Sequence, residues 1–206
     1  MDIALYLGIA AVIVLVVANG LFVATEFSYV AVRRTRIEQL AENGHTRARL
    51  LLTALKQLDK YIAATQLGIT MSSLALGWIG EPVIAGLLEA PLHNALGTGL
   101  GEAASHTIAV IIAFVVITGL HIVFGELAPK TIALQKSEET ALWVAAPIAV
   151  FTRVFGPFIW ALNGLGRLAV RAIGIKSITE TENNIMEPEE LERVIEASAN
   201  AGQLST

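Results

Sequence analysis

The chain has 206 residues, of which 54% are hydrophobic and 16% are charged. A soluble globular domain carries about 25% charged residues, so this composition argues against a soluble domain and favours a protein in lipid. The absence of cysteine excludes disulfides and thiolate metal ligands. The formal net charge of −4 is unevenly distributed: residues 1–176 carry 13 Lys/Arg and 11 Asp/Glu, whereas residues 177–206 carry one and seven.

Three segments are long and apolar enough to cross a membrane, which takes roughly 20 predominantly apolar residues. The predicted spans are about 3–32, 61–88 and 103–126. The second span is more polar than the others, which favours a helix buried among its neighbours. The first span follows no basic segment and contains no small-residue cleavage site, so we expect it to be retained and not removed as a signal peptide.

The basic residues predict the orientation of these spans. Lys and Arg are absent from residues 1–32 and 61–129, whereas seven occur in residues 33–60 and six between Lys130 and Lys176. Because Lys and Arg mark cytoplasmic loops, we expect a multi-pass protein of the plasma membrane. Its N-terminus would lie outside and its C-terminus in the cytoplasm.

The first basic loop is expected to be helical at about 35–57. Its apolar residues recur near the helical period of 3.6, with a break at Asn43–Gly44. One interpretation is a basic amphipathic helix lying along the inner membrane surface. The other is an ordinary cytoplasmic hairpin.

Residues 141–172 contain two short apolar stretches separated by Arg153 and interrupted by Pro147 and Pro157. They predict a bent, partly embedded helix pair on the cytoplasmic side, with a fourth span as the alternative. The acidic residues 177–206 predict a short cytoplasmic helical segment, after which we expect a further domain. The fold class predicted is therefore an all-α membrane protein with three transmembrane helices, juxtamembrane helices and this acidic segment.

Glu126 is a carboxylate expected at membrane depth, where ionisable residues are rare and usually functional. It lies in the sequence GELAPK. Because Pro129 has no N–H, the carbonyl of Gly125, four residues earlier, loses its helical hydrogen bond. Broken helices of this kind present backbone oxygens to cations in transporters. The alternative is a helix end at the membrane interface, where Lys130 neutralises Glu126.

Two other carboxylates have simpler explanations. Glu81 precedes Pro82, which repeats the arrangement of the third span, but a solvated helix end near the outer surface accounts for it. Glu26 falls at the inner edge of the first span, close to Arg33 and Arg34, where an interfacial ion pair is an equally good account.

Polar and small residues follow one face of each span. They are Asn19 and Glu26 with Thr25 and Ser28 adjacent, then Gln66, Thr70, Ser73 and Gly77 with Ser72 beside them, then Thr118, His121 and Gly125. Such residues either allow close helix packing or line an ion path. A lone His121 is more often an interior histidine than a ligand.

The chemistry of these groups narrows the ion and the class of function. Oxygen ligands with one or two carboxylates suit Mg²⁺, Ca²⁺ or Na⁺, whereas copper prefers softer ligands. The sequence contains no P-loop, no Ser/His/Asp spacing and no glycine-rich cofactor loop. Nothing in it indicates an enzyme.

Four sequence runs resemble the transmembrane domain (DUF21) of the CNNM/CorC family. They are NGLFVATEFSYVAV, AATQLGITMSSLALGWIGEP, HIVFGELAPKTIAL and PFIWALNGLGRLAVRAIGI. The resemblance covers about residues 3–176, and its GE-x-x-PK motif is fairly specific. It implies a DUF21-like domain over residues 1–176, a homodimer in membrane lipid, and cytoplasmic CBS domains downstream of residues 177–206. No nucleic acid partner is expected.

The resemblance also implies magnesium transport, with Mg²⁺ as the transported ion and Na⁺ as the coupling ion in an export reaction. A magnesium-binding membrane sensor or scaffold that regulates another transporter is the alternative. The family's ion site, carried over, consists of Thr25, Ser73, Gly125 and Glu126. This chain's own residues add Asn19, Ser72 and Ser28 as candidates. The sequence departs from the family at Val23, where many members have serine, and at Ser73, where many have asparagine.

Overall fold

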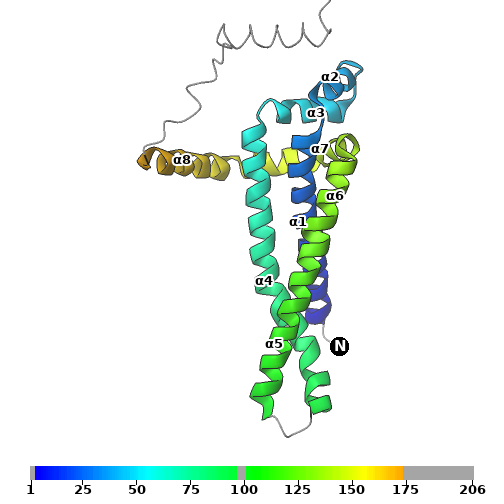
Figure 1. The fold of residues 1–206 in the computed structure, drawn as a ribbon, viewed down its shortest axis with the longest axis vertical. Coiled ribbons are helices and arrows are strands. Elements are labelled where there is room, and N and C mark those ends of the chain that lie inside the picture. Colours follow the sequence, from blue (N-terminus) through cyan, green and yellow to red (C-terminus); the bar gives the residue numbers. More distant parts are fainter. Residues whose placement is uncertain (1–2, 97–100, 174–206) are drawn as a thin grey trace, which may run out of the picture. The chain divides into compact units, whose positions relative to one another are not determined.

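A computed structural model of the chain describes residues 3–96 and 101–173, and nearly all of them are helical (Figure 1). No strand occurs within these two ranges, which confirms the all-α class. The chain divides into two compact units, Met1–Trp160 and Ala161–Thr206. The acidic segment predicted at residues 177–206 lies outside the described residues.

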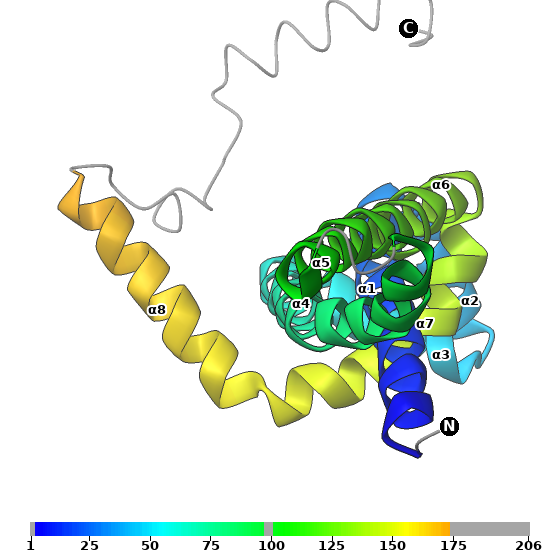
Figure 2. The ribbon, with the colours of Figure 1, turned by 90° about the horizontal axis from the view of Figure 1, so that it is seen from below.

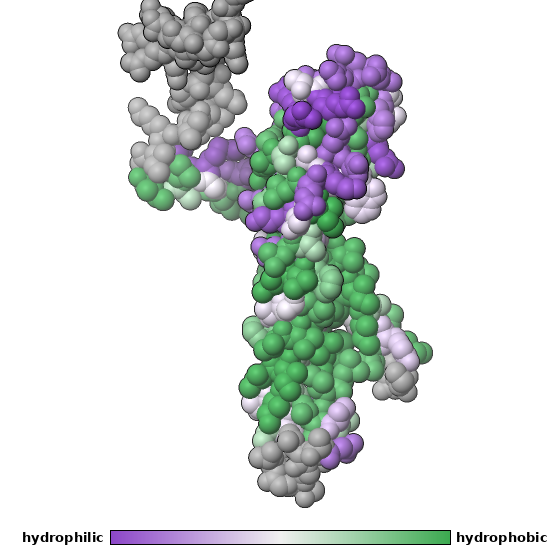
Figure 3. Space-filling view, turned by 45° about the vertical axis from the view of Figure 1, so that its right-hand side comes forward, coloured by the Kyte–Doolittle hydropathy of each residue, from purple (hydrophilic) through white to green (hydrophobic). Residues whose placement is uncertain are grey.

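Three helices are long and apolar enough to cross a membrane, as predicted. They are α1 (Ile3–Ala31), α4 (Leu58–Leu96, with the candidate span over Leu58–Leu92), and a composite helix with its candidate span over Ala104–Gln135. The composite helix consists of α5 (Gly101–Leu120), η2 (His121–Leu127) and α6 (Ala128–Gln135). In Figure 2, α1, α4 and the composite helix lie side by side. Figure 3 shows hydrophobic side chains covering this bundle and hydrophilic ones gathered over α2 and α3.

The composite helix continues past the predicted end of the third span at Glu126. Pro129 does not end it, because the preceding turn is a π-helix, η2, and Pro129 lies in the first turn of α6. Pro129 has no N–H to give to the Gly125 carbonyl, but its fixed φ suits the first turn of a helix, so the composite helix continues. A single π-helical segment can thus be inserted without breaking the span, and such segments often occur at functional sites.

The first basic loop forms a helical hairpin of α2 (Arg34–Glu42) and α3 (Thr46–Leu55). The chain reverses at Gly44, whose φ of +87° is a conformation that favours glycine. The apolar faces of the hairpin are buried against α7 (Ser137–Val154) through Ile37, Leu51 and other side chains. Because these faces cover protein and not lipid, the structure supports the hairpin interpretation.

Helix α7 continues into α8 (Gly156–Ala172) after a bend of 75° at residue 155. A bent pair was predicted here, although it begins a few residues earlier than residue 141. One face of α7 is buried in the first unit, including Val144 and Ile148. By length and composition the pair could form one further, broken span. Its depth in the membrane stays a prediction.

The buried apolar residues of the first unit form two separate clusters. The large cluster joins α1, α2, α3, α4 and α7, and its members include Phe22, Tyr29, Tyr61 and Ile148. The small cluster joins the three spans through Val12, Leu76 and Ile117. On α1 and α4 the chain between the two clusters carries polar residues, and on the composite helix His121 and Gly125 follow Ile117; these residues form the candidate site.

Candidate ion site between the three spans

A chain of hydrogen bonds links one residue from each span with a backbone carbonyl. Asn19 of α1 is only 1% exposed, and its Nδ2 donates to the carbonyl oxygen of Gly125 at 2.9 Å. Ser73 of α4 donates to Asn19 Oδ1 at 3.2 Å. The same hydroxyl lies 3.2 Å from Nε2 of His121, at the start of η2. We call these four residues the polar layer.

The direction of the protons in the polar layer follows from its one unambiguous acceptor. The Gly125 carbonyl can only accept, so the amide nitrogen of Asn19 must face it and the amide oxygen must face Ser73. Ser73 has one proton, which it gives to Asn19. His121 Nε2 must therefore donate to the Ser73 oxygen. Every member then has a partner, as buried polar groups require.

Gly125 occupies its position for steric and electronic reasons. A Cβ there would lie 2.8 Å from Cδ2 of His121 and 3.1 Å from Nδ2 of Asn19, so a side chain would displace the polar layer. The carbonyl that the Pro129 spacing predicted to be released is found bonded to a side chain of another helix. The η2 turn and Pro129 together make this oxygen available.

Glu126 follows Gly125 and is exposed on the single chain. It takes part in none of the ion pairs formed among the described residues. Lys130 does not neutralise it, because the Lys130 ammonium lies over the ring of Phe27, 4.5 Å from the centroid. The interfacial ion pair considered as the alternative is therefore absent from the structure, and the carboxylate is available to another group.

The other predicted ligands lie outside the polar layer. Thr25 and Ser28 are fully buried, but their hydroxyls donate to carbonyls of α1 itself, those of Leu21 and Thr25. Thr25 lies six residues beyond Asn19, about 9 Å along the helix. Ser72 is buried beside Ser73 on α4. These three hydroxyls could reach a cation only if the helices shifted.

Glu26 and Glu81 differ in what surrounds them. The ion pair of Glu26 with Arg33 or Arg34, one of the two accounts considered, is not among the ion pairs of the described residues, and Arg34 binds Glu38 at 3.0 Å. Glu81 lines a cavity of about 310 Å³ between α4 and α5. Ser73, Thr118 and His121 line the same cavity, so it connects a carboxylate with the polar layer.

His121 has a hydrogen-bond partner between the spans, as a lone histidine in such a sequence indicates, and it shares a helix face with Gly125, as its spacing predicts. Its partner Ser73 lies 48 residues away, so no spacing rule within a helix could identify that contact. The role of Glu81 in a cavity could not be read from its sequence neighbours, since it depends on how α4 meets α5.

The donor set determines which cations this region could hold. Within residues 3–96 and 101–173 no group of three or more His, Cys, Asp or Glu side chains converges as a metal site. The polar layer instead offers an amide oxygen, a hydroxyl and a backbone carbonyl, and Glu126 follows Gly125 in the chain. Such oxygens suit hard cations such as Mg²⁺ and Na⁺.

The three apolar helices and the polar layer between them define a multi-pass membrane protein with an internal polar site. The chain belongs to the family described as Cyclin M transmembrane N-terminal domain (CNNM), whose model matches residues 10–206. This confirms the family resemblance found in the sequence.

Several curated relatives are similar to the chain over nearly its whole length. The UPF0053 protein YugS of Bacillus subtilis (strain 168) is 40% identical over 98% of this chain and 46% of its own length. The UPF0053 protein YhdT of the same organism is 43% identical over 93% of this chain and 41% of its own. The uncharacterized protein Rv1841c of Mycobacterium tuberculosis (strain ATCC 25618 / H37Rv) is 35% identical over 90% of this chain and 52% of its own length. The chain thus spans about half the length of these relatives.

Proposed function

We propose that this chain is the membrane domain of a Mg²⁺ transporter that exports the ion from the cytoplasm in exchange for Na⁺. It would not be an enzyme. The observation that carries the proposal is the polar layer, in which three spans bring oxygen atoms together beside an unpaired carboxylate, Glu126. Ionisable and polar groups at membrane depth are costly and mark ion paths.

In the proposed mechanism the hydrogen bonds of the polar layer and the cation replace each other. Without a cation, Asn19 satisfies the Gly125 carbonyl and Ser73 satisfies Asn19. Rotation of the Asn19 amide would turn its oxygen toward a cation and release the Gly125 carbonyl, which could then accept the same cation. Glu126 supplies the negative charge that offsets the loss of water, which Mg²⁺ gives up reluctantly. Thr25, Ser28 and Ser72 are the further oxygens that a helix shift could add.

The proposal includes a homodimer. Glu126 on η2 and Gln66 and Thr70 on α4 are exposed on the single chain. Polar groups facing hydrocarbon are unfavourable, so a second copy of the chain is expected to cover part of this surface. The N-terminus would lie outside the plasma membrane, and CBS domains would follow in the full-length protein.

The test is Mg²⁺ flux in liposomes that contain the purified chain and an internal magnesium dye. Glu126→Gln keeps the size of the side chain and removes its charge, and we expect it to abolish both flux and Mg²⁺ binding by calorimetry. Glu42→Gln, an exposed carboxylate on α2, is the matched control and should change neither. Normal binding by Glu126→Gln would refute the assignment of Glu126.

The same experiment separates transport from sensing. A sensor or scaffold would bind Mg²⁺ and show the Glu126→Gln effect in calorimetry, yet it would give no flux above that of empty liposomes at any Na⁺ gradient. A transporter coupled to sodium should give a flux that rises with the Na⁺ gradient.

A further inference from the structure

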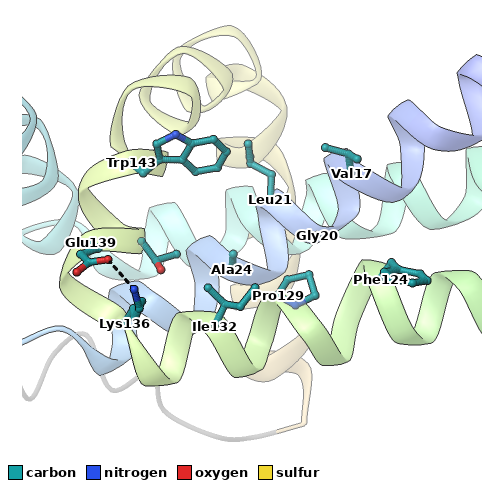
Figure 4. A pocket seen from close by; sticks show the side chains of 11 residues that line it. Val17, Gly20, Leu21, Ala24, Phe124, Pro129, Ile132, Lys136, Glu139 and Trp143 are labelled. Atoms are coloured by element: carbon teal, nitrogen blue, oxygen red, sulfur yellow. Dashed lines mark hydrogen bonds and ion pairs between the residues drawn. The ribbon is translucent and has the colours of Figure 1, made fainter.

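A groove separate from the polar layer lies between α1, η2, α6 and α7 (Figure 4). Its volume is about 550 Å³, within the range of roughly 300–1,000 Å³ typical of ligand pockets. Its walls are apolar over most of their length, and include Val17, Leu21, Ala24, Phe124, Pro129 and Ile132. In the first unit this groove is thus an apolar channel on the outside of the membrane bundle.

Small residues create the floor of the groove. A Cβ on Gly20 would lie 2.9 Å from Cγ of Pro129 and 3.1 Å from the carbonyl oxygen of Phe124. Helix α1 therefore contacts the η2–α6 junction directly at this point. The larger side chains on either side form the walls of the groove; among them, Val17 is 63% exposed and Ile132 is 55% exposed. An elongated apolar group can lie between them.

One end of the groove carries a pair of opposite charges and an indole ring. Lys136 lies at the corner between α6 and α7, and its Nζ is 3.4 Å from Oε2 of Glu139. Both side chains are exposed, at 67% and 77%, so the pair is weakly held and can admit another charged group. Trp143 lines the same end and is 63% exposed. Indole rings are typical of the headgroup level of a membrane.

We propose that the groove binds one acyl chain of a zwitterionic phospholipid whose headgroup carries a primary ammonium, as in phosphatidylethanolamine. The acyl chain lies along the apolar walls. The lipid phosphate replaces Glu139 beside Lys136, and the ammonium replaces Lys136 beside Glu139. One cation and one anion three residues apart are complementary to such a headgroup.

The charges at this end disfavour the two other occupants. An anionic lipid would pair with Lys136 but would leave Glu139 without a cation, since Glu138 does not line the groove and is itself paired with Arg36 at 3.4 Å. A second copy of the chain would have to cover an ion pair with an apolar surface or place its own charges opposite. A zwitterionic headgroup satisfies both charges of the pair.

The test uses quenching of Trp143 fluorescence by phospholipids with brominated acyl chains. The protein carries Trp78→Phe and Trp160→Phe, which leave Trp143 as its single tryptophan. Phosphatidylethanolamine, phosphatidylcholine and phosphatidylglycerol are each titrated into the protein in mixed micelles. We expect saturable quenching with at least several-fold higher affinity for phosphatidylethanolamine.

Two variants locate the headgroup. Glu139→Gln should remove the preference for phosphatidylethanolamine over phosphatidylglycerol, because it removes the partner of the ammonium. Glu42→Gln makes the same charge change on α2 and should leave the preference intact. Equal, non-saturable quenching by all three lipids would mean ordinary bilayer contact and overturn the proposal. A preference for phosphatidylglycerol, or no quenching because a second protein copy covers Trp143, would overturn it too.

Discussion

At the scale of single residues, the buried polar groups divide into those with partners and those without. Asn19 uses both ends of its amide, which joins α1 to the two other spans. Tyr29 and Thr152 are buried to 3% and 2% exposure, yet their hydroxyls have no hydrogen-bond partner among the described residues. Removing a polar group that has a partner should lower the stability of the protein, whereas removing one without a partner should leave it unchanged or raise it slightly.

Asn19→Leu should destabilise the protein. The leucine has a similar volume but leaves the Gly125 carbonyl and the Ser73 hydroxyl without their partner, which costs about 1–2 kcal/mol. Unfolding in mixed micelles by a denaturing detergent measures the loss. Ser28→Ala is the control, because Ser28 bonds within its own helix, and it should cost clearly less. Equal costs would show that the Asn19 bonds contribute nothing specific.

Tyr29→Phe should leave the stability unchanged or raise it slightly. The hydroxyl is buried without a partner, and the ring keeps its contact with Tyr61, at 6.2 Å between centroids. Removing the ring as well, in Tyr29→Ala, should cost about 3–5 kcal/mol, as aromatic-to-alanine changes in cores do. The same unfolding assay compares them. A large loss in Tyr29→Phe would reveal a partner for the hydroxyl, such as a buried water.

At the scale of elements, η2 is the feature on which the polar layer depends. The π-turn places His121 and Gly125 toward α1 and α4, and it lets the helix pass Pro129 without a break. A regular α-helix with an N–H at position 129 would give the Gly125 carbonyl a backbone donor and withdraw it from Asn19.

Pro129→Ala should have this effect. The new N–H at position 129 can bond to the Gly125 carbonyl, four residues earlier, so the helix gains a hydrogen bond while Asn19 loses its acceptor. We expect a protein that is at least as helical by circular dichroism but binds Mg²⁺ more weakly in calorimetry. Pro147→Ala in α7 is the control, since it lies outside the polar layer. Unchanged Mg²⁺ binding by Pro129→Ala would mean that the site does not need the released carbonyl.

Much of the fold and part of the candidate site could be predicted from the sequence, because spans and loops are determined by local composition. Apolar length predicted three membrane helices, and the Asn43–Gly44 dipeptide predicted the break between α2 and α3. The i to i−4 rule for proline predicted the released Gly125 carbonyl. Each of these inferences uses residues within one turn or one segment.

The parts that could not be predicted depend on contacts between segments. The third span was expected to end at Glu126, since a π-turn leaves no clear local signal in the sequence. Thr25 and Ser28 were predicted as ligands together with Asn19; their hydroxyls donate within α1, and their binding of an ion stays a prediction. The partners of Asn19 lie 54 and 106 residues away, so no spacing rule within a helix could identify them.

At the scale of the whole molecule, the first unit has a basic end and an end without Lys or Arg. The α2–α3 hairpin lies at one end of α4, and the start of α5 lies at the other (Figure 1). The distribution of Lys and Arg predicts that the hairpin lies in the cytoplasm.

Labelling of single cysteines tests this orientation, and the chain has no cysteine of its own. Arg47→Cys on α3 and Ala90→Cys on α4 both replace exposed residues. In intact cells a membrane-impermeant maleimide should label Ala90→Cys and should reach Arg47→Cys only after permeabilisation. Labelling of both from the same side would contradict an odd number of spans between the two ends, and the reverse pattern would invert the topology.

The two apolar clusters differ in size, and this difference predicts which end of the first unit opens more easily. The small cluster holds α4 and α5 together with few buried side chains, including Leu76 and Ile117, whereas the large cluster joins five helices. Because the cost of admitting water grows with the apolar area exposed, thermal fluctuation should open the small-cluster end far more often. A driving force such as an ion gradient would therefore have to act on the end that contains α2, α3 and α7.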